Sequence, residues 1–266
     1  MNLLCLYFGN SNRILSFINY LKTTYPHATI QPYNIFNDSD FERLQSHVND
    51  SYDGIFLLSY GSDKTASEGF SSKQSKYNSK CSVSCLKQKY PERFKTIIDI
   101  IYKNMLTPIL GVCYGAEILN LFYGGDIHNT GVRNQALFKT RLDISNKLFH
   151  GLERIIYPQY NHFYISRNNV SKPIAFNLSD FSQSAYQHSK YHYGVSFHLV
   201  NSDSQCLKII DNFIDIIEYK KKAIYLYILL ILVAATLVLK YFYNFKHGNL
   251  TLIILLLMVC LETLFH

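Results

Sequence analysis

The chain has 266 residues, which suffices for one α/β domain of about 200 residues and an appendage. Its formal net charge of +7 comes from scattered lysines and arginines, and without a dense basic stripe we do not expect it to bind nucleic acid. The six cysteines show neither a disulfide framework nor the spacing of a metal site. We therefore expect the globular part to reside in a reducing compartment and to hold no metal or cofactor.

The first fifth of the chain alternates strand and helix patterns. Apolar runs predict strands over 3–8, 29–33 and 54–58. Helical spacing predicts helices between them, one over 40–48 and an earlier one with a core face made by Ile14, Phe17, Ile18 and Leu21. Such alternation is typical of βαβ units and predicts an α/β fold, a mostly parallel open sheet flanked by helices. Ligands of such sheets bind beyond the carboxyl ends of the strands.

A polar segment over 63–89, rich in serine and lysine, interrupts this pattern and is interpreted as a loop insertion. Cys81 and Cys85 lie within it and lack the further ligands of a metal site, so we interpret them as free thiols. A helix is expected from Pro91, because proline suits the first helical position and an apolar stripe follows it.

The stretch 108–117 (PILGVCYGAE) combines a short buried strand, a cysteine at a turn and the start of a helix. Gly111 and Gly115 flank Cys113, and glycine allows a tight turn and a close approach of the backbone. A thiol at a helix N-terminus lies where the helix dipole favours the reactive thiolate. Cys113 is therefore a candidate nucleophile, and the alternative is a small buried core cysteine.

The stretch 193–198 (YGVSFH) is the second signal. Its alternation predicts one strand with Gly194, Ser196 and His198 on the same face. A thiol nucleophile requires a base, and His198 is the candidate, although a lone histidine on a strand can also be structural. His162, in the β-like segment before it, is interpreted as structural.

These two stretches resemble motifs of the class I glutamine amidotransferases. The family carries Gly-x-Cys-x-Gly-x-Gln, which Gly111, Cys113 and Gly115 match, whereas Glu117 stands where the family has Gln. It also carries Gly-Val-Gln-Phe-His-Pro-Glu, matched in this chain at Gly194, Val195, Phe197 and His198. The resemblance covers residues 1–218 and implies a flavodoxin-like α/β domain over that range.

The resemblance implies that Cys113 attacks the amide of glutamine or a γ-glutamyl group and that His198 transfers the proton. The N–H of Tyr114 and the loop at Gly61 would bind the oxyanion, and Glu117 would lie near the amino-acid end of the substrate. A separate synthase subunit would accept the ammonia.

Three positions depart from the family pattern. Val200 replaces the acidic third member of the triad, for which Asn201 or Asp203 are substitutes; Tyr60 replaces a loop glycine, and Glu117 replaces Gln. These departures favour one alternative, a catalytically silent scaffold or regulator at a membrane. A second alternative is a γ-glutamyl peptidase that uses the same cysteine and histidine.

The C-terminal part of the sequence is strongly apolar. Residues 223–243 predict a transmembrane helix, and residues 250–265 a second transmembrane or re-entrant helix, which together form a hairpin. Lys220, Lys221 and Lys222 favour a cytosolic globular domain, so we expect a multi-pass membrane location. The alternative is a buried pair of helices in a soluble fold.

Overall fold

The computed structural model describes residues 1–9, 12–59, 83–129, 139–156, 159–160, 163–165, 170–179, 181–199 and 204–243. The chain divides into two compact units, Met1–Ile214 and Asp215–His266. The predicted domain boundary at residue 218 stays a prediction.

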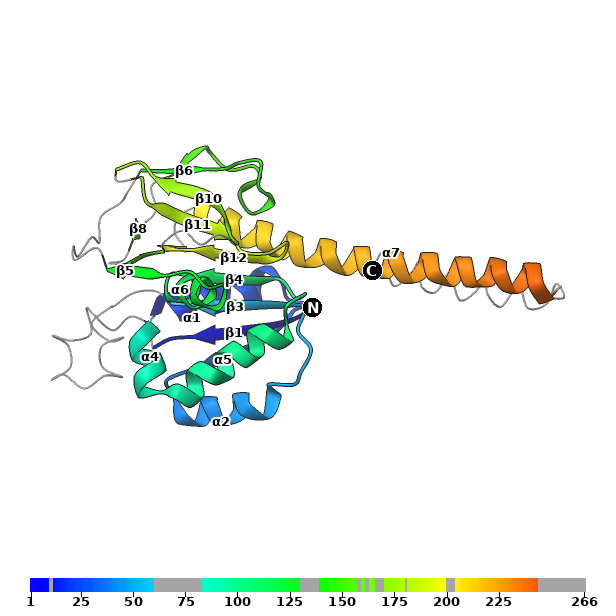
Figure 1. Cartoon of the computed structure of the whole chain (residues 1–266), viewed down its shortest axis with the longest axis horizontal. Helices are drawn as coiled ribbons and strands as arrows, with labels where there is room; N and C mark the ends of the chain where they lie inside the picture. The colour runs from blue at the N-terminus through cyan, green and yellow to red at the C-terminus, as the bar shows by residue number, and fades with distance from the viewer. Residues whose placement is uncertain are drawn as a thin grey trace. The chain divides into compact units, whose positions relative to one another are not determined.

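The helices and strands of the described residues are shown in Figure 1. The helices are α1 (Asn12–Thr24), α2 (Asp38–His47), α4 (Val83–Lys89), α5 (Pro91–Lys103), α6 (Tyr114–Phe122), the short 3-10 helix η2 (Lys147–Phe149) and α7 (Ser204–Tyr243). The strands are β1 (Asn2–Tyr7), β2 (Thr29–Asn34), β3 (Gly54–Leu58), β4 (Ile109–Val112), β5 (Ile127–Asn129), β6 (Thr140–Leu142), β7 (Ile155–Ile156), β8 (Gln159–Tyr160), β9 (Phe163–Ile165), β10 (Lys172–Asn177), β11 (Gln183–Gln187), β12 (His192–Val195) and β13 (Phe197–His198).

The main sheet is mixed, with the strand order β2-β1-β3-β4-β12-β11-β10-β6-β7. Its first five strands pair in parallel, which confirms the predicted open parallel sheet. From β12 outward the strands pair antiparallel, an extension that the sequence analysis did not predict. Two further pairs, β13-β8 and β5-β9, form small separate sheets.

Strand β3 shows how helices cover both faces of the parallel half. Ile55 and Leu57 belong to the apolar cluster that includes residues of α2, α4, α5 and α6. Phe56 points the other way and packs edge-on against Phe17 of α1 and Phe213 of α7, with ring centroids 5.3 and 5.0 Å apart. A parallel strand covered on both faces has an almost continuous apolar sequence, as this strand does.

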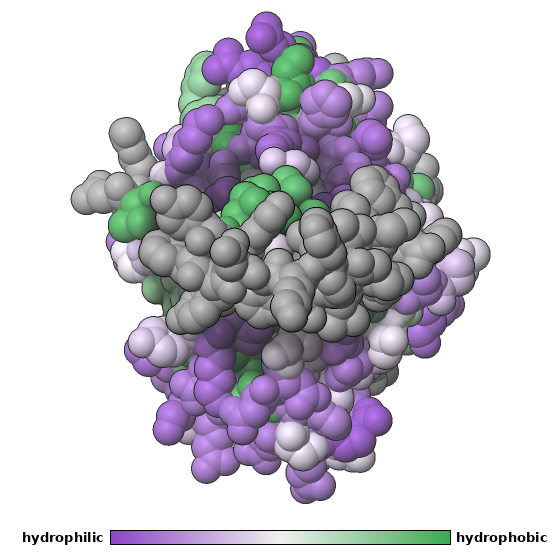
Figure 2. All heavy atoms as spheres, turned by 90° about the vertical axis from the view of Figure 1, so that its right-hand side faces the viewer, coloured by the Kyte–Doolittle hydropathy of each residue, from purple (hydrophilic) through white to green (hydrophobic). Residues whose placement is uncertain are grey.

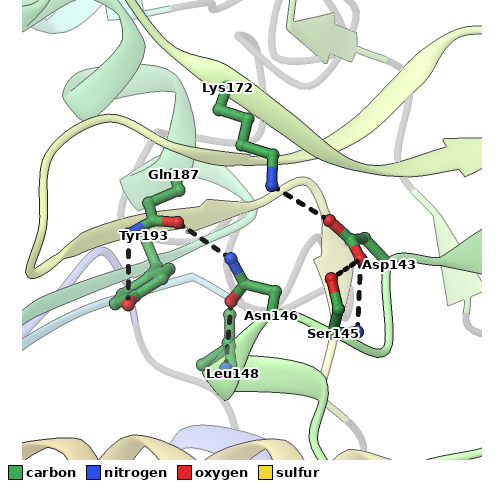
Figure 3. Close-up of polar contacts among 7 residues, drawn as sticks. All are labelled: Asp143, Ser145, Asn146, Leu148, Lys172, Gln187 and Tyr193. Atoms are coloured by element: carbon green, nitrogen blue, oxygen red, sulfur yellow. Dashed lines mark hydrogen bonds and ion pairs between the residues drawn. The ribbon is translucent and has the colours of Figure 1, made fainter.

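Polar contacts secure the antiparallel half near its edge (Figure 3). The Asp143 carboxylate accepts hydrogen bonds from the Ser145 backbone and hydroxyl and pairs with Lys172 at 3.2 Å. The Ser145 hydroxyl, more than Lys172, lowers the pKa of Asp143. Beside it, the Asn146 amide donates to the Gln187 side chain at 2.8 Å, and its oxygen accepts from the N–H of Leu148.

Two sequence predictions need correction at the level of single elements. The polar segment 63–89 ends in a helix, α4, whose Leu86 joins the apolar cluster; the rest of that segment lies outside the described residues. The predicted strand over 193–198 is interrupted at Ser196, whose N–H and hydroxyl both donate to the carbonyl of Ser184. Phe197 and His198 then pair with β8 instead.

Helix α7 also corrects the prediction of a membrane span over 223–243. It is one helix of 40 residues, continuous through Lys220–Lys222. Across the described ranges, no helix combines the length and apolarity that crossing a membrane requires.

The predicted multi-pass membrane location with a cytosolic domain is therefore wrong. The predicted second span over 250–265 lies outside the described residues. On the face drawn in Figure 2, hydrophilic side chains make up most of the coloured surface, with small apolar patches between them.

Candidate active site

Cys113 occupies a sharp, strained turn between β4 and α6. Its φ of 54° and ψ of −111° lie in a region that a residue with a side chain rarely adopts. Cys113 is the N-cap of α6, and its carbonyl accepts hydrogen bonds from the N–H groups of Ala116 and Glu117. This is the strand–turn–helix geometry of a nucleophile elbow, as the sequence predicted.

The turn requires glycine at two positions, because neighbouring backbone atoms occupy the space that a side chain would need. A Cβ on Gly115 would lie 2.0 Å from the carbonyl oxygen of Leu57 in β3. A Cβ on Gly111 would lie 2.5 Å from the carbonyl oxygen of Gly115. The glycines of the motif therefore hold α6 close to β3 and β4, with the cysteine at the contact.

The first turn of α6 presents a backbone donor beside the thiol. Within the described part of the chain, the N–H of Tyr114 has no acceptor, as is usual for the first residues of a helix. The Tyr114 ring packs against Phe8 with centroids 5.0 Å apart. Burial, and secondarily Glu117, raises the pKa of the Tyr114 phenol, which stays neutral.

His198 follows the strand next to the elbow. The N–H of Cys113 donates to the carbonyl of Val195 at 2.7 Å, and His198 comes three residues after Val195. Cys113 and His198 thus leave the carboxyl ends of two adjacent parallel strands, β4 and β12. The His198 side chain is buried, and its carbonyl accepts from the Cys206 thiol in the first turn of α7 at 3.7 Å.

Glu117 is a buried acid one helical turn after Cys113. Its side chain is 4% exposed, and burial alone raises the pKa of its carboxyl from 4.5 to about 8. Oxygen Oε2 has no hydrogen-bond partner among the described residues. A buried carboxyl group without a charged partner is a feature of functional sites more often than of cores.

Several predicted residues of the site lie outside the described residues. They are Tyr60, Gly61, His162, Val200, Asn201 and Asp203, together with Cys81. The roles assigned to them stay predictions.

The sequence analysis missed a cluster of buried imidazoles at the opposite end of β4 and β12. His192 is fully buried, and its ring nitrogens contact the Tyr123 hydroxyl at 2.7 Å and the Thr107 carbonyl at 3.0 Å. His188 stacks on the Tyr123 ring and bonds through Nδ1 to the Ser171 hydroxyl. Burial, and then the nearby His192, lowers the pKa of His188 to about 3.

Two cavities of the described surface lie away from the elbow. One of about 420 Å³ is lined by residues of the antiparallel edge, among them Arg141, Arg154 and Phe176. Another, of about 370 Å³, lies beside Tyr52 and Lys103. Across the described ranges, no three His, Cys, Asp or Glu side chains are placed to hold a metal ion.

The chain resembles known proteins in both sequence and fold. Residues 86–215 match the family model described as glutamine amidotransferase class-I. A relative from Methanocaldococcus jannaschii, which is one subunit of a glutamine-hydrolysing GMP synthase, is 33% identical over 136 residues. The match covers 48% of this chain and 70% of that protein.

Solved structures share the fold. A protein from Thermoplasma acidophilum, described as a putative subunit of GMP synthase, superposes with a TM-score of 0.58 at 20% identity, covering 83% of this chain and 96% of the other. A glutamine amidotransferase from Thermotoga maritima superposes with a TM-score of 0.50 at 14% identity, covering 82% and 85%.

Proposed function

Because this chain belongs to the class I glutamine amidotransferase family, we propose that it hydrolyses the side-chain amide of glutamine through a thioester on Cys113. The observation that carries the proposal is the register of β4 and β12. The strained turn at Cys113 follows β4, and the segment that carries His198 follows the neighbouring parallel strand β12; the hydrogen bond from the Cys113 N–H to the Val195 carbonyl supports their proximity. A nucleophile and its base must meet in this way.

The proposed reaction has two halves. In the first, Cys113 Sγ attacks the amide carbon while His198 takes the thiol proton, and the C–N bond breaks as His198 returns that proton to the departing ammonia. In the second, His198 takes a proton from water as the oxygen attacks the thioester carbon; the C–S bond then breaks, glutamate is released, and His198 returns the proton to the Cys113 thiolate. No redox step or metal is involved in this sequence.

The oxyanion of each half-reaction requires donors about 3 Å away. The backbone N–H of Tyr114, which has no acceptor among the described residues, supports its assignment as one donor. We assign the second donor to the loop at Gly61 on the strength of the family motif. The helix dipole of α6 favours the Cys113 thiolate from the same side.

We assign the ammonia to a separate synthase subunit. The support is that the M. jannaschii relative is itself one subunit of a GMP synthase. The test adds a synthase subunit that has no glutaminase of its own, and glutamine should sustain its amination only when this chain is present. Amination that requires added ammonium in both cases would contradict the partnership.

The decisive experiment treats the full chain with an electrophilic glutamine analogue and locates the adduct by mass spectrometry. We expect labelling of Cys113, which is lost in His198→Ala, and release of ammonia from glutamine by the unlabelled protein only. No adduct in a correctly folded chain would favour the silent scaffold. An adduct together with cleavage of γ-glutamyl peptides, but not of glutamine, would favour the peptidase.

Cys5 supplies the matched control. It is a fully buried thiol in β1, and burial raises its pKa to about 12, so it stays protonated and unreactive. The Cys5→Ala variant should label and turn over like the parent chain. Labelling that depends on Cys5 would contradict the assignment of Cys113.

A further inference from the structure

The carboxyl group of Glu117 is buried without interactions that would explain its burial in structural terms. It lies in the first turn of α6, where its N–H donates to the carbonyl of Cys113 at 3.2 Å. Its side chain is 4% exposed, yet Oε2 has no partner among the described residues. A buried oxygen left in this state destabilises a protein, and native structures contain few of them.

Among the described residues, no charged neighbour offsets this burial. Strands β3 and β4, which pack against α6, carry no titratable side chain. The titratable groups described on the other elements packed against α6 are His192 and Tyr193 of β12 and Lys87 and Lys89 of α4. None of these groups contributes to the raised pKa of Glu117, which burial causes. On α6 itself, the titratable neighbour of Glu117 is the Tyr114 phenol.

The side chains of His128 in β5 and Tyr164 in β9 lie outside the description. For the groups that are described, the consequence is simple: at neutral pH Glu117 is a neutral carboxylic acid. In that form it presents one O–H donor and one carbonyl acceptor, the same pair that a glutamine side chain presents at this position of the family motif.

We propose that Glu117 binds substrate as a protonated acid, donating its O–H to an acceptor oxygen at the amino-acid end of the glutamine, and that the ionised side chain excludes the substrate. This proposal rests on the proposed glutaminase function and adds that substrate binding requires a proton on the Glu117 carboxyl group. An ionised Glu117 lacks the O–H donor, and it repels the substrate carboxylate strongly because the protein interior has a low effective dielectric constant.

The proposal predicts a split between KM and kcat. Between pH 7 and pH 9 the KM of the full chain for glutamine should rise about tenfold, because the neutral fraction of a group titrating near pH 8 falls by that factor. In Glu117→Gln, which keeps a donor and an acceptor at every pH, this tenfold rise should be absent. The ratio of the two KM values at each pH removes any pH dependence that both proteins share and so isolates Glu117.

Glu92→Gln is the matched control, because it makes the same chemical change at an exposed position in α5. Its KM should follow the parent chain across the pH range. A Glu117→Gln variant whose KM rises with pH as the parent's does would overturn the proposal.

A second measurement does not depend on the folding of Glu117→Gln. The Cys113→Ala chain retains Glu117 but cannot form a thioester, so calorimetry yields its Kd for L-glutamine directly. A tenfold weakening from pH 7 to pH 9 supports the proposal, and an unchanged Kd overturns it while leaving the glutaminase function intact. No ammonia release from the parent chain at any pH would overturn both.

Discussion

At the amino end of β4 and β12, His192 uses both ring nitrogens in hydrogen bonds, whereas at the carboxyl end Glu117 leaves one oxygen without a partner among the described residues. The backbone conformation also differs between the two ends, since Cys113 has a positive φ and the residues of β4 and β12 do not. Polar groups that are buried and paired rigidify a fold, and strain and unpaired groups concentrate at functional sites. The two hydrogen bonds of His192 predict a stabilising role for that residue, and the strain at Cys113 supports the chemistry proposed for the carboxyl end.

The largest effect is expected at the contact between α6 and β3. Gly115→Ala places a Cβ within 2.0 Å of a backbone oxygen, so α6 must shift. We expect a loss of roughly 4 kcal/mol in the free energy of unfolding, measured by urea denaturation. Gly124→Ala is the control, because its φ is +76° but no atom lies within 4 Å, and it should cost only about 1 kcal/mol. Equal losses would show that the close approach is unimportant.

The second effect tests the stabilising role of the amino end. His192→Ala removes a fully buried ring and leaves the Tyr123 hydroxyl and the Thr107 carbonyl without it, so we expect a loss of about 3 kcal/mol in unfolding free energy. The labelling of Cys113 should persist wherever the variant is folded. His47→Ala, at an exposed ion pair with Asp50, should change stability by less than about 1 kcal/mol.

The third effect is a pH dependence of stability that arises from His188. Its pKa is about 3 in the folded protein and 6.5 when unfolded, so the unfolded chain binds the extra proton. Stability is complete above pH 6.5 and decreases as the pH falls towards 3, by about 2 kcal/mol between pH 6 and pH 4. Urea denaturation at several pH values should show that this loss is absent in His188→Gln. A variant with the parent's pH slope would assign the loss to other groups.

The smallest effect concerns one hydroxyl. Tyr123→Phe keeps the ring that stacks on His188 and removes the hydrogen bond to His192, so we expect a loss of about 1 kcal/mol in unfolding free energy. In the Tyr123→Phe, His192→Ala double variant the two losses should not add, because both remove the same contact. Full additivity would mean that the hydroxyl acts elsewhere.

The sequence predicted the parallel half of the fold because its signals are local. The apolar run 54–58 coincides with β3, and the predicted helix stripe is buried on α1, at Ile14, Phe17, Ile18 and Leu21. The elbow at Cys113 could also be predicted from the sequence, since glycines on both sides of a cysteine indicate a tight turn.

What the sequence did not predict depends on contacts between distant residues. The end of β12 at Val195 and the pairing of Phe197 and His198 with β8 involve strands that are distant in sequence, which no local pattern contains. The imidazole cluster brings His188 and His192 onto Tyr123 from another part of the chain. Apolar composition alone led to a membrane span over 223–243, but it did not reveal that α7 continues unbroken from Ser204.

The start of α7 limits how this protein can be shortened for expression. Cys206 contacts the carbonyl of His198, the Asn212 amide donates to the carbonyls of Leu148 and His150, and Phe213 covers Phe56. A fragment that stops ahead of α7 would remove part of the cover over Phe56, which α7 shares with α1, and the contact to the segment that carries the proposed base. Any truncated version intended for crystallisation or assay must therefore retain these first three turns.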